Sequence, residues 1–309
     1  MKIAAFNVKN LGWKKVNKPG VRNILIKIIS RYSVVVMLEV MDSSGKAMDK
    51  LLTELNNTRG NKQHPYAMKK SELLGRSTYK EQFVFFYKEE EVELVDSFQY
   101  VERHVDIIAR EPFILLFRCP NTVVKDLVLI PVHTKPEDTE KELNALDDVV
   151  KAVKRKWEID NIMILGDFNA DGPYLRKRGR QNIRIHRPPY HWLIDEDADT
   201  TSSDSNDHTY DRIVVYGDEM YEAIVSDSAK PFNFQEKYRL SKVTTRAISD
   251  HYPVEVELEE KEEEEDEEDE EDEEDEEDEE DEEDEEDEED KEDEDDEEEE
   301  EDEEDEDWE

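Results

Sequence analysis

The sequence predicts an α/β fold in which two packed sheets are flanked by helices. Apolar runs rich in β-branched residues recur along the first 258 residues, and only a few segments with helical spacing separate them. No linker rich in proline, glycine or serine divides this part of the chain, and its length is within reach of a single domain. We therefore expect one folded domain over residues 1–258.

The spacing of the apolar residues supports each element in turn. Residues 2–8 have the alternation of a strand, and residues 33–40 form a continuous apolar run that is typical of a strand buried on both faces. Residues 140–157 have the amphipathic spacing of a long helix, and alternation over residues 254–258, after Pro253, indicates a closing strand. Strands are expected at residues 2–8, 33–40, 82–88, 113–119, 125–136, 161–170, 210–217 and 250–258, and helices at residues 20–32, 47–56 and 140–157.

Acidic residues are concentrated at the end of the chain. The formal net charge is −47, and between residues 259 and 309 only Lys261, Lys291 and Trp308 are not acidic. The preceding residues are nearly neutral as a group. A segment of this composition repels itself and has no apolar surface to bury, so we expect residues 259–309 to form a disordered tail.

The cysteine content and the hydropathy narrow the class of protein. Cys119 is the single cysteine, so no intrachain disulfide can form. Neither a signal peptide nor an apolar stretch long enough to span a membrane is visible. These features favour the nucleus or the cytoplasm, and secretion would require a signal peptide that preceded this sequence.

Four acids and two asparagines interrupt or end the apolar strand runs. Burying a carboxylate such as Glu39, inside VVVMLEVMD, is costly unless the carboxylate is paired or binds a cation. Taken singly, each acid is better explained by pairing with an arginine or with the backbone than by metal binding. Repetition of one context favours a shared divalent cation, and oxygen ligands suit Mg²⁺ or Ca²⁺ rather than Zn²⁺. The candidate ligands are Asn7, Glu39, Asp167, Asn169, Asp211 and Asp250.

Two histidines stand beside these candidate ligands. His133 in PVHTKP and His251 in SDHYP each adjoin an apolar strand segment, although a lone histidine is more often structural. A pair of imidazoles, one accepting and one donating a proton, is what hydrolysis of a phosphodiester by water needs near neutral pH. A divalent cation that stabilises charge on the phosphate would complete such a site.

Motifs along the chain resemble a known family. KIAAFNV, LEV, GRSTYKEQFVFFYK, REPF, PVHTKP, GDFNAD, TYDRIVV and SDHYPVEVEL occur in this order between residues 2 and 258. Together they resemble the deoxyribonuclease I family of the endonuclease/exonuclease/phosphatase superfamily, and TYKEQFVFFYK looks closer to its gamma-type (DNase I-like 3) branch. The resemblance implies a four-layer α/β/β/α sandwich that nicks double-stranded DNA, leaving 5′-phosphate and 3′-hydroxyl ends. Mg²⁺, with Mn²⁺ as a substitute, and Ca²⁺ are the cofactors it implies.

The resemblance also implies roles for individual residues. His133 and His251 are the expected acid/base pair, with Glu81 supporting the first histidine and Asp211 the second. Glu39 is the expected main metal ligand, and Asn7, Asp167, Asn169 and Asp250 are expected to hold metal, water or phosphate. DNA contacts are expected from Lys9, Arg76, Tyr79, Arg110 and Tyr174. Structural calcium is expected near Asp106 and Glu111 and near Asp199.

The sequence departs from the family pattern at several places. Gly172 and His208 stand where the family has the two cysteines of a disulfide. Lys69, Lys70 and Phe113 match the apolar surface with which the family's namesake binds actin. Because the lysines would bury unpaired charge in such a contact, we expect no inhibition by actin. A monomer is expected, and the acidic tail replaces the basic tail typical of the gamma-type branch.

The sequence leaves two other functions open. One is a different phosphoesterase of the same superfamily, such as an abasic-site endonuclease or a phosphoinositide phosphatase. Abasic-site enzymes usually pair GDLN with SDHCP, so GDFN and SDHYP disfavour that function. The other is a histone or DNA chaperone with an inactive body, which is disfavoured because every expected catalytic position is retained. The tail itself has three candidate roles: a solubility segment, a DNA mimic that occupies the basic groove, or a segment that binds histones in chromatin.

Removal of residues 259–309 separates these roles of the tail. Autoinhibition predicts faster cleavage of naked DNA at low salt, with a difference that shrinks as salt screens the charges. Recruitment to chromatin predicts that the shortened chain cleaves nucleosomes more slowly but cleaves naked DNA at an unchanged rate. Equal rates on both substrates, with lower solubility of the shortened chain, indicate the solubility role. The measurement is the nicking rate of both chain lengths on plasmid and on nucleosomes.

Overall fold

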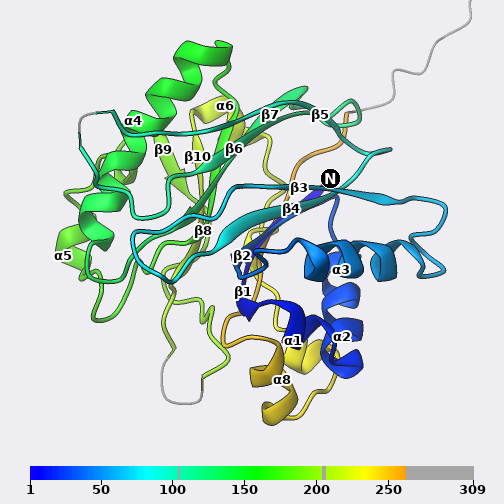
Figure 1. Ribbon diagram of the computed structural model, residues 1–309. Helices are drawn as coiled ribbons and strands as arrows, with labels where there is room; N and C mark the ends of the chain where they lie inside the picture. The colour runs from blue at the N-terminus through cyan, green and yellow to red at the C-terminus, as the bar shows by residue number, and fades with distance from the viewer. Residues whose placement is uncertain (104, 204–206, 262–309) are drawn as a thin grey trace, which may run out of the picture. The chain divides into compact units, whose positions relative to one another are not determined.

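The computed structural model describes residues 1–103, 105–203 and 207–261 (Figure 1). The expected disordered tail falls mainly on residues 262–309, which lie outside the described residues. Backbone hydrogen bonding to the folded body continues past Leu258. Glu260 forms a β-bridge with Thr122, and the backbone N–H of Lys261 donates to the carbonyl of Asn121 at 3.1 Å. Contacts of the folded body therefore extend to Lys261.

Two six-stranded mixed sheets form the body. Each sheet has one parallel pair at its centre, β1 with β2 in the first sheet and β7 with β8 in the second. The first sheet has the order β11 (Lys230–Pro231), β12 (Val254–Glu257), β1 (Lys2–Leu11), β2 (Val34–Val40), β4 (Gln82–Lys88), β3 (Tyr66–Lys70). The second has the order β5 (Glu93–Gln99), β6 (Phe113–Arg118), β7 (Asp126–His133), β8 (Ile162–Asp167), β10 (Asp211–Tyr216), β9 (Tyr190–Trp192).

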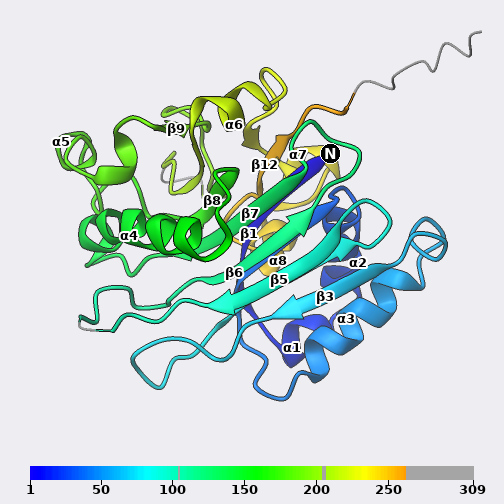
Figure 2. The same cartoon turned by 90° about the horizontal axis from the view of Figure 1, so that it is seen from above.

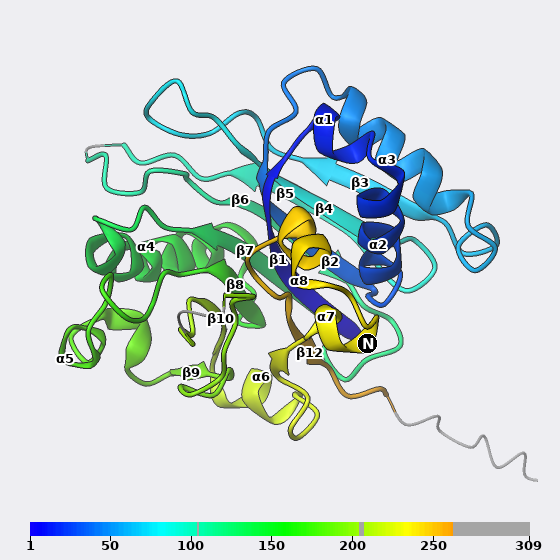
Figure 3. The same cartoon turned by 90° about the horizontal axis from the view of Figure 1, so that it is seen from below.

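Helices cover the outer face of each sheet, as the views in Figures 2 and 3 show. Against the first sheet lie α1 (Trp13–Val16), α2 (Pro19–Ile29), α3 (Lys46–Asn56), α7 (Phe234–Lys237) and α8 (Lys242–Ile248). Against the second lie α4 (Thr139–Trp157) and the 3₁₀ helix η1 (Arg184–His186), which the short helix α5 (Lys177–Arg180) precedes. Helix α6 (Asp218–Glu222) contributes Met220 to the core between the sheets. The expected four-layer α/β/β/α sandwich is confirmed.

Burial on both faces explains the continuous apolar runs of the central strands. In β1, Ile3 and Ala5 pack between the sheets, while Ala4 and Phe6 pack against the helices. Each strand face thus meets its own apolar layer, and a polar residue inside such a strand is confined to the places where a layer ends. No helix in the described part of the chain is both long and apolar enough to cross a membrane.

The structure contains elements that the apolar spacing did not reveal. The strands β3, β5, β9 and β11, the short helices α1 and α5–α8 and the 3₁₀ helix η1 were not expected. Residues of β5 are mostly half exposed, and α8 buries only Thr245 and Ile248, so neither has a strong apolar pattern. Phe113 was expected at a surface that matches the actin contact, but it is buried in the core between the sheets because it faces inward at the start of β6.

The parallel pair β7 and β8 approaches closely just before the end of β8. Gly166 has a φ of +142°, and a Cβ atom there would lie 2.0 Å from the carbonyl oxygen of Val132. Only glycine adopts this conformation without strain and leaves room for the neighbouring backbone. The glycine of the GDFN motif is thus required by the packing beside Asp167.

Replacement of Gly166 by alanine tests this close approach. Gly166→Ala should destabilise the fold by about 3 kcal/mol or more, because strained φ and a backbone clash add together. Gly20→Ala is the matched control, because Gly20 lies in α2 and, apart from its chain neighbours and the backbone of α2 itself, no atom of the described residues is within 4 Å of its Cβ position. That control should be neutral or stabilising. Urea unfolding of both variants measures the difference, and equal midpoints would contradict the argument.

Candidate active site

A bulge where β1 and β2 end brings two polar side chains to the site. The two strands pair in register up to Asn7 and resume at Leu11. Lys9, Asn10 and Glu39 have φ values of 47°, 53° and 58°, a left-handed conformation that is costly for residues other than glycine. The bulge turns Glu39 toward β1, where its Oε1 accepts a hydrogen bond from Asn7 Nδ2 at 2.9 Å and its Oε2 accepts one from the Asn10 backbone at 3.1 Å.

Strand register in the second sheet places three functional side chains in a row. His133, the last residue of β7, pairs with Asp167, the last residue of β8. Asp167 in turn pairs with Asp211, the first residue of β10. Directly paired residues point to the same side of a sheet, so these three side chains gather at one edge. Asn169 follows with a φ of 47°, and its backbone N–H donates to Asp167 Oδ1 at 3.0 Å.

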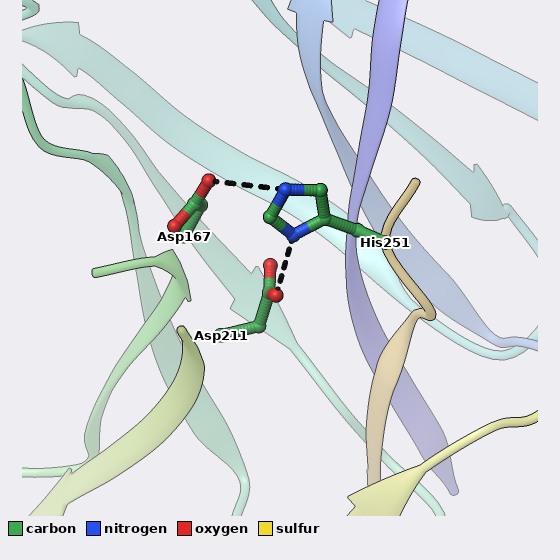
Figure 4. A group of neighbouring side chains, drawn as sticks. All are labelled: Asp167, Asp211 and His251. Carbon is green, nitrogen blue, oxygen red and sulfur yellow. Dashed lines mark hydrogen bonds and ion pairs between the residues drawn. The ribbon is translucent and has the colours of Figure 1, made fainter. Parts of the chain in front are cut away.

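Ser249 holds the segment that carries His251. Its hydroxyl donates to the carbonyl of Asn7 at 2.6 Å and accepts from the backbone N–H of His251 at 3.0 Å. The imidazole then lies with Nδ1 2.7 Å from Asp211 Oδ2, which joins the first sheet to the second (Figure 4). The buried serine of the SDH motif is therefore a structural link between the two halves of the site.

His133 has an equivalent carboxylate partner. Its Nδ1 lies 2.5 Å from Oε1 of Glu81, the residue that precedes β4. Arg110 contacts the same oxygen through Nε at 3.1 Å and donates to the carbonyl of His133 at 3.3 Å. Each histidine thus has one nitrogen held by a carboxylate, which fixes the orientation of the ring.

The other ring nitrogens of both histidines face a single carboxylate oxygen. Nε2 of His133 is 3.7 Å, and Nε2 of His251 is 3.8 Å, from Oδ2 of Asp167. Asn7 Nδ2 also donates to this oxygen at 3.0 Å. Asp167 therefore lies between two imidazoles that come from different sheets.

Charge within the site shifts the pKa values of both histidines upward. Burial alone lowers the pKa of His251, but the carboxylates of Asp211 and Asp167 outweigh burial and raise it to about 10. Burial also opposes the shift at His133, where Glu81 and Asp167 raise the pKa above its usual value. Burial, and then repulsion from Asp167, raises the pKa of Asp211 to about 6, although His251 opposes this. The negative charges of these neighbouring carboxylates therefore favour protonated histidines and would also favour a bound cation.

The donor set fits a hard divalent cation. Within the described residues, Asp167, Asp211 and His251 form the one group of three acids or histidines whose ligand atoms lie within 4.8 Å of one another. Asn7 bonds to carboxylate oxygens of both Glu39 and Asp167, so these oxygens lie close together. Carboxylate oxygens at such spacing suit Mg²⁺, Mn²⁺ or Ca²⁺, whereas the amide oxygen of Asn7, an expected ligand, accepts the backbone N–H of Lys9 at 3.0 Å. The expected ligand Asp250 is placed differently, because its Oδ2 pairs with Lys9 Nζ at 2.7 Å.

Of the expected DNA contacts, Lys9 lies in the bulge of β1 and pairs with Asp250, and the other four lie in loops and turns outside the row of strand-end residues. Arg110 is bound within the site, and Tyr79 donates from its hydroxyl to Asn10 Oδ1 at 3.1 Å. Arg76 pairs with Asp106, with Nε 2.9 Å from Oδ1. Tyr174 is 41% exposed, with its ring centroid 5.4 Å from that of Tyr210.

The calcium sites stay predictions. Asp106 is already paired with Arg76, and Glu111 Oε1 accepts a backbone hydrogen bond from Glu102 at 2.9 Å. Asp199 Oδ1 accepts hydrogen bonds at 2.9 Å from both the backbone and the hydroxyl of Thr201. Each carboxylate has a local partner in the described residues, and no geometry here adds support for a bound ion.

Gly172 and His208 are in contact, as expected for positions that the family joins by a disulfide. A Cβ atom at Gly172 would lie 2.7 Å from Cε1 of His208, so the imidazole fills the space directly over the glycine. His208 Nδ1 is 3.4 Å from Asp171 Oδ2, which also accepts the backbone N–H of Thr209 at 3.1 Å. Noncovalent contacts therefore tie these two segments together.

Three further residues support the site and were not found from the sequence. Lys15 Nζ donates to the backbone of the β1 bulge, and Thr200 Oγ1 accepts from the backbone N–H of Asp211 at 3.2 Å. Buried Glu142 accepts from the backbone N–H of Lys135, next to the loop that follows His133, at 3.0 Å. A lysine or a glutamate in an amphipathic helix carries no signal of such a role, because solvated helix faces have the same composition.

Comparisons with known proteins identify the family of this chain. A profile of the endonuclease/exonuclease/phosphatase family matches residues 4–251. Deoxyribonuclease-1 of Sus scrofa is 42% identical over 264 residues, which cover 84% of this chain and 92% of that protein. Deoxyribonuclease-1-like 1 of Cricetulus griseus is 41% identical, covering 84% of each chain, and deoxyribonuclease gamma of Homo sapiens is 38% identical, covering 84% and 86%. These identities do not single out the gamma-type branch.

Solved structures with low sequence identity share the fold. A family protein from Leptotrichia buccalis superimposes with a TM-score of 0.58 at 18% identity, covering 84% of this chain and 99% of that one. The human Nocturnin catalytic domain gives a TM-score of 0.56 at 13% identity, covering 84% and 94%. The family profile and the relatives of 38–42% identity show that the chain belongs to the endonuclease/exonuclease/phosphatase family and, within it, to the deoxyribonuclease I family.

Proposed function

We propose that this protein is a divalent-metal-dependent endonuclease that nicks double-stranded DNA by a two-histidine general acid/base mechanism. The observation that carries the proposal is the approach of His133 Nε2 and His251 Nε2, at 3.7 and 3.8 Å, to the same oxygen of Asp167. A scissile phosphate bound there lies between one proton acceptor and one proton donor. The names of the 38–42% identical relatives, all deoxyribonucleases, support DNA as the substrate.

Hydrolysis requires two proton transfers at opposite sides of the phosphorus atom. One imidazole accepts a proton from water as the water oxygen forms its bond to phosphorus. The other imidazole donates a proton to the 3′ oxygen as the bond from that oxygen to phosphorus breaks. The products are a 5′-phosphate and a 3′-hydroxyl, and the protons balance because one is taken and one is given. A bound divalent cation supplies positive charge for the phosphate oxygens.

The surrounding residues prepare these transfers. Glu81 and Asp211 hold Nδ1 of their histidines, so that Nε2 of each ring faces the substrate position. Glu39 and Asp167 would hold the cation, with Asn7 between them, and Asn169 orients Asp167. The proposal also includes contacts to the DNA phosphates from Lys9, Arg76, Tyr79, Arg110 and Tyr174. It further includes structural Ca²⁺ ions that stabilise the fold near Asp106 and Glu111 and near Asp199.

Substitution of either histidine tests the mechanism. His133→Ala and His251→Ala should each lower the rate of nicking supercoiled plasmid by about a hundredfold or more, because each removes one proton transfer. His64→Ala is the matched control, because His64 is an exposed histidine whose carboxylate partner, Glu90, is also exposed and is not one of the site residues. The control should keep the parent rate.

Two results would contradict the proposal. A parent protein that leaves plasmid supercoiled in Mg²⁺ with Ca²⁺, with or without its acidic tail, is not a DNA endonuclease. Parent-like nicking by either active-site variant would instead remove that histidine from the mechanism.

Metal removal and Glu39→Gln test the cation. A chelator should abolish nicking, and excess Mg²⁺ or Mn²⁺ should restore it. Glu39→Gln should raise the Mg²⁺ concentration for half-maximal rate about tenfold or more, because a neutral amide replaces an anionic ligand. Glu90→Gln, on the exposed Glu90, is the control and should leave the Mg²⁺ requirement unchanged. Full nicking in the presence of chelator would rule out metal dependence.

A further inference from the structure

Lys15 is directed at the backbone of the β1 bulge rather than at solvent. It lies in α1, directly after the bulge, and its Nζ donates to the carbonyl of Val8 at 2.6 Å and to that of Lys9 at 2.8 Å. Burial lowers the pKa of Lys15 to about 8, although Asp250 and Glu39 raise it in part. A cation removed from water in this way needs good hydrogen bonds, and the two carbonyls provide them.

The turn that Lys15 contacts is strained. Lys9 and Asn10 both have left-handed backbone conformations, at φ values of 47° and 53°. This conformation is costly for residues other than glycine, and a turn of this kind persists only where surrounding contacts define it. The ammonium of Lys15 is one such contact, because it binds two successive carbonyls at the entrance to the turn.

The same turn positions the candidate metal ligands. Asn7, which precedes it, donates to both Glu39 and Asp167. The backbone N–H of Asn10 donates to the second carboxylate oxygen of Glu39 at 3.1 Å. The Lys9 side chain pairs with Asp250 at 2.7 Å. A shift of this turn would therefore move three carboxylates that come from separate segments of the chain.

We propose that Lys15 is a positioning residue whose ammonium fixes the Lys9–Asn10 turn and thereby holds Glu39 and Asp167 at the spacing that binds the divalent cation. The proposal rests on the proposed metal-dependent function, but it concerns a residue that touches neither the cation site nor the substrate position. Its effect on catalysis is therefore expected to pass through metal affinity.

Lys15→Met tests this role, because methionine keeps much of the chain length and removes the hydrogen-bond donors. The dissociation constant for Mn²⁺, measured by electron paramagnetic resonance without DNA, should rise about tenfold or more. Nicking at fixed subsaturating Mg²⁺ should fall by a similar factor and recover toward the parent rate at saturating Mg²⁺. The matched control is Lys14→Met, on the exposed neighbouring lysine, which should leave the Mn²⁺ dissociation constant unchanged.

Chemical rescue separates positioning from a general loss of packing. Cys119 is buried, and burial raises the pKa of its thiol to about 12, so it reacts slowly with alkylating agents. In Lys15→Cys, the introduced thiolate displaces bromide from 2-bromoethylamine and forms a thioether that ends in an ammonium at nearly the lysine length. Recovery of Mn²⁺ affinity after this reaction, and none after alkylation with iodoacetamide, is the expected result.

The outcomes distinguish this inference from the proposed function. Parent-like Mn²⁺ affinity in Lys15→Met, or affinity lost in Lys15→Cys and not recovered by the ammonium, would overturn the positioning role. If the parent binds Mn²⁺ without nicking DNA, the proposed function fails. Weaker Mn²⁺ binding by Lys15→Met would still support the positioning role in that case.

Discussion

The site depends on one buried carboxylate, Asp167, at the place where the ends of two sheets meet. Strand register aligns it with His133 on one side and Asp211 on the other. The first sheet adds Asn7, which donates a hydrogen bond to Asp167, and His251, whose Nε2 lies 3.8 Å from Asp167 while its Nδ1 contacts Asp211. A carboxylate in this position is tolerated because two imidazoles and the amide of Asn7 surround it. The close approach at Gly166 keeps it there.

Each of the two carboxylate–histidine pairs orients an imidazole ring and places a negative charge beside it. Each pair takes its histidine and its acid from different segments, so the pairs also hold the two sheets in register at the open edge. The cost of burying these groups is balanced within the site, because each charge has an opposite neighbour. A divalent cation bound as proposed would add to the same balance, and metal affinity would then depend on the geometry of the strand ends.

Strained backbone conformations also help to bring the site residues together. The left-handed residues Lys9, Asn10 and Glu39 lie where β1 and β2 separate, and they turn polar groups inward that a regular strand would direct into an apolar layer. The contacts that stabilise this bulge come from α1 and from loop residues rather than from the ladder. Noncovalent contacts at Gly172 and His208 similarly hold the opposite rim, in a chain that has no second cysteine.

The sequence by itself determined the two-sheet fold, because apolar runs buried on both faces have a pattern that edge strands and solvated helices lack. It also identified the polar positions at strand ends, since Glu39, Asp167 and His133 each interrupt an apolar run. Glu81 was found through the family motif alone. The tertiary structure decided how these residues meet: that both histidines face Asp167, that Asp250 pairs with Lys9, and that Lys15 bonds to the bulge. Such contacts join residues far apart in the chain or depend on a local backbone reversal, and neither leaves a periodic signal in the sequence.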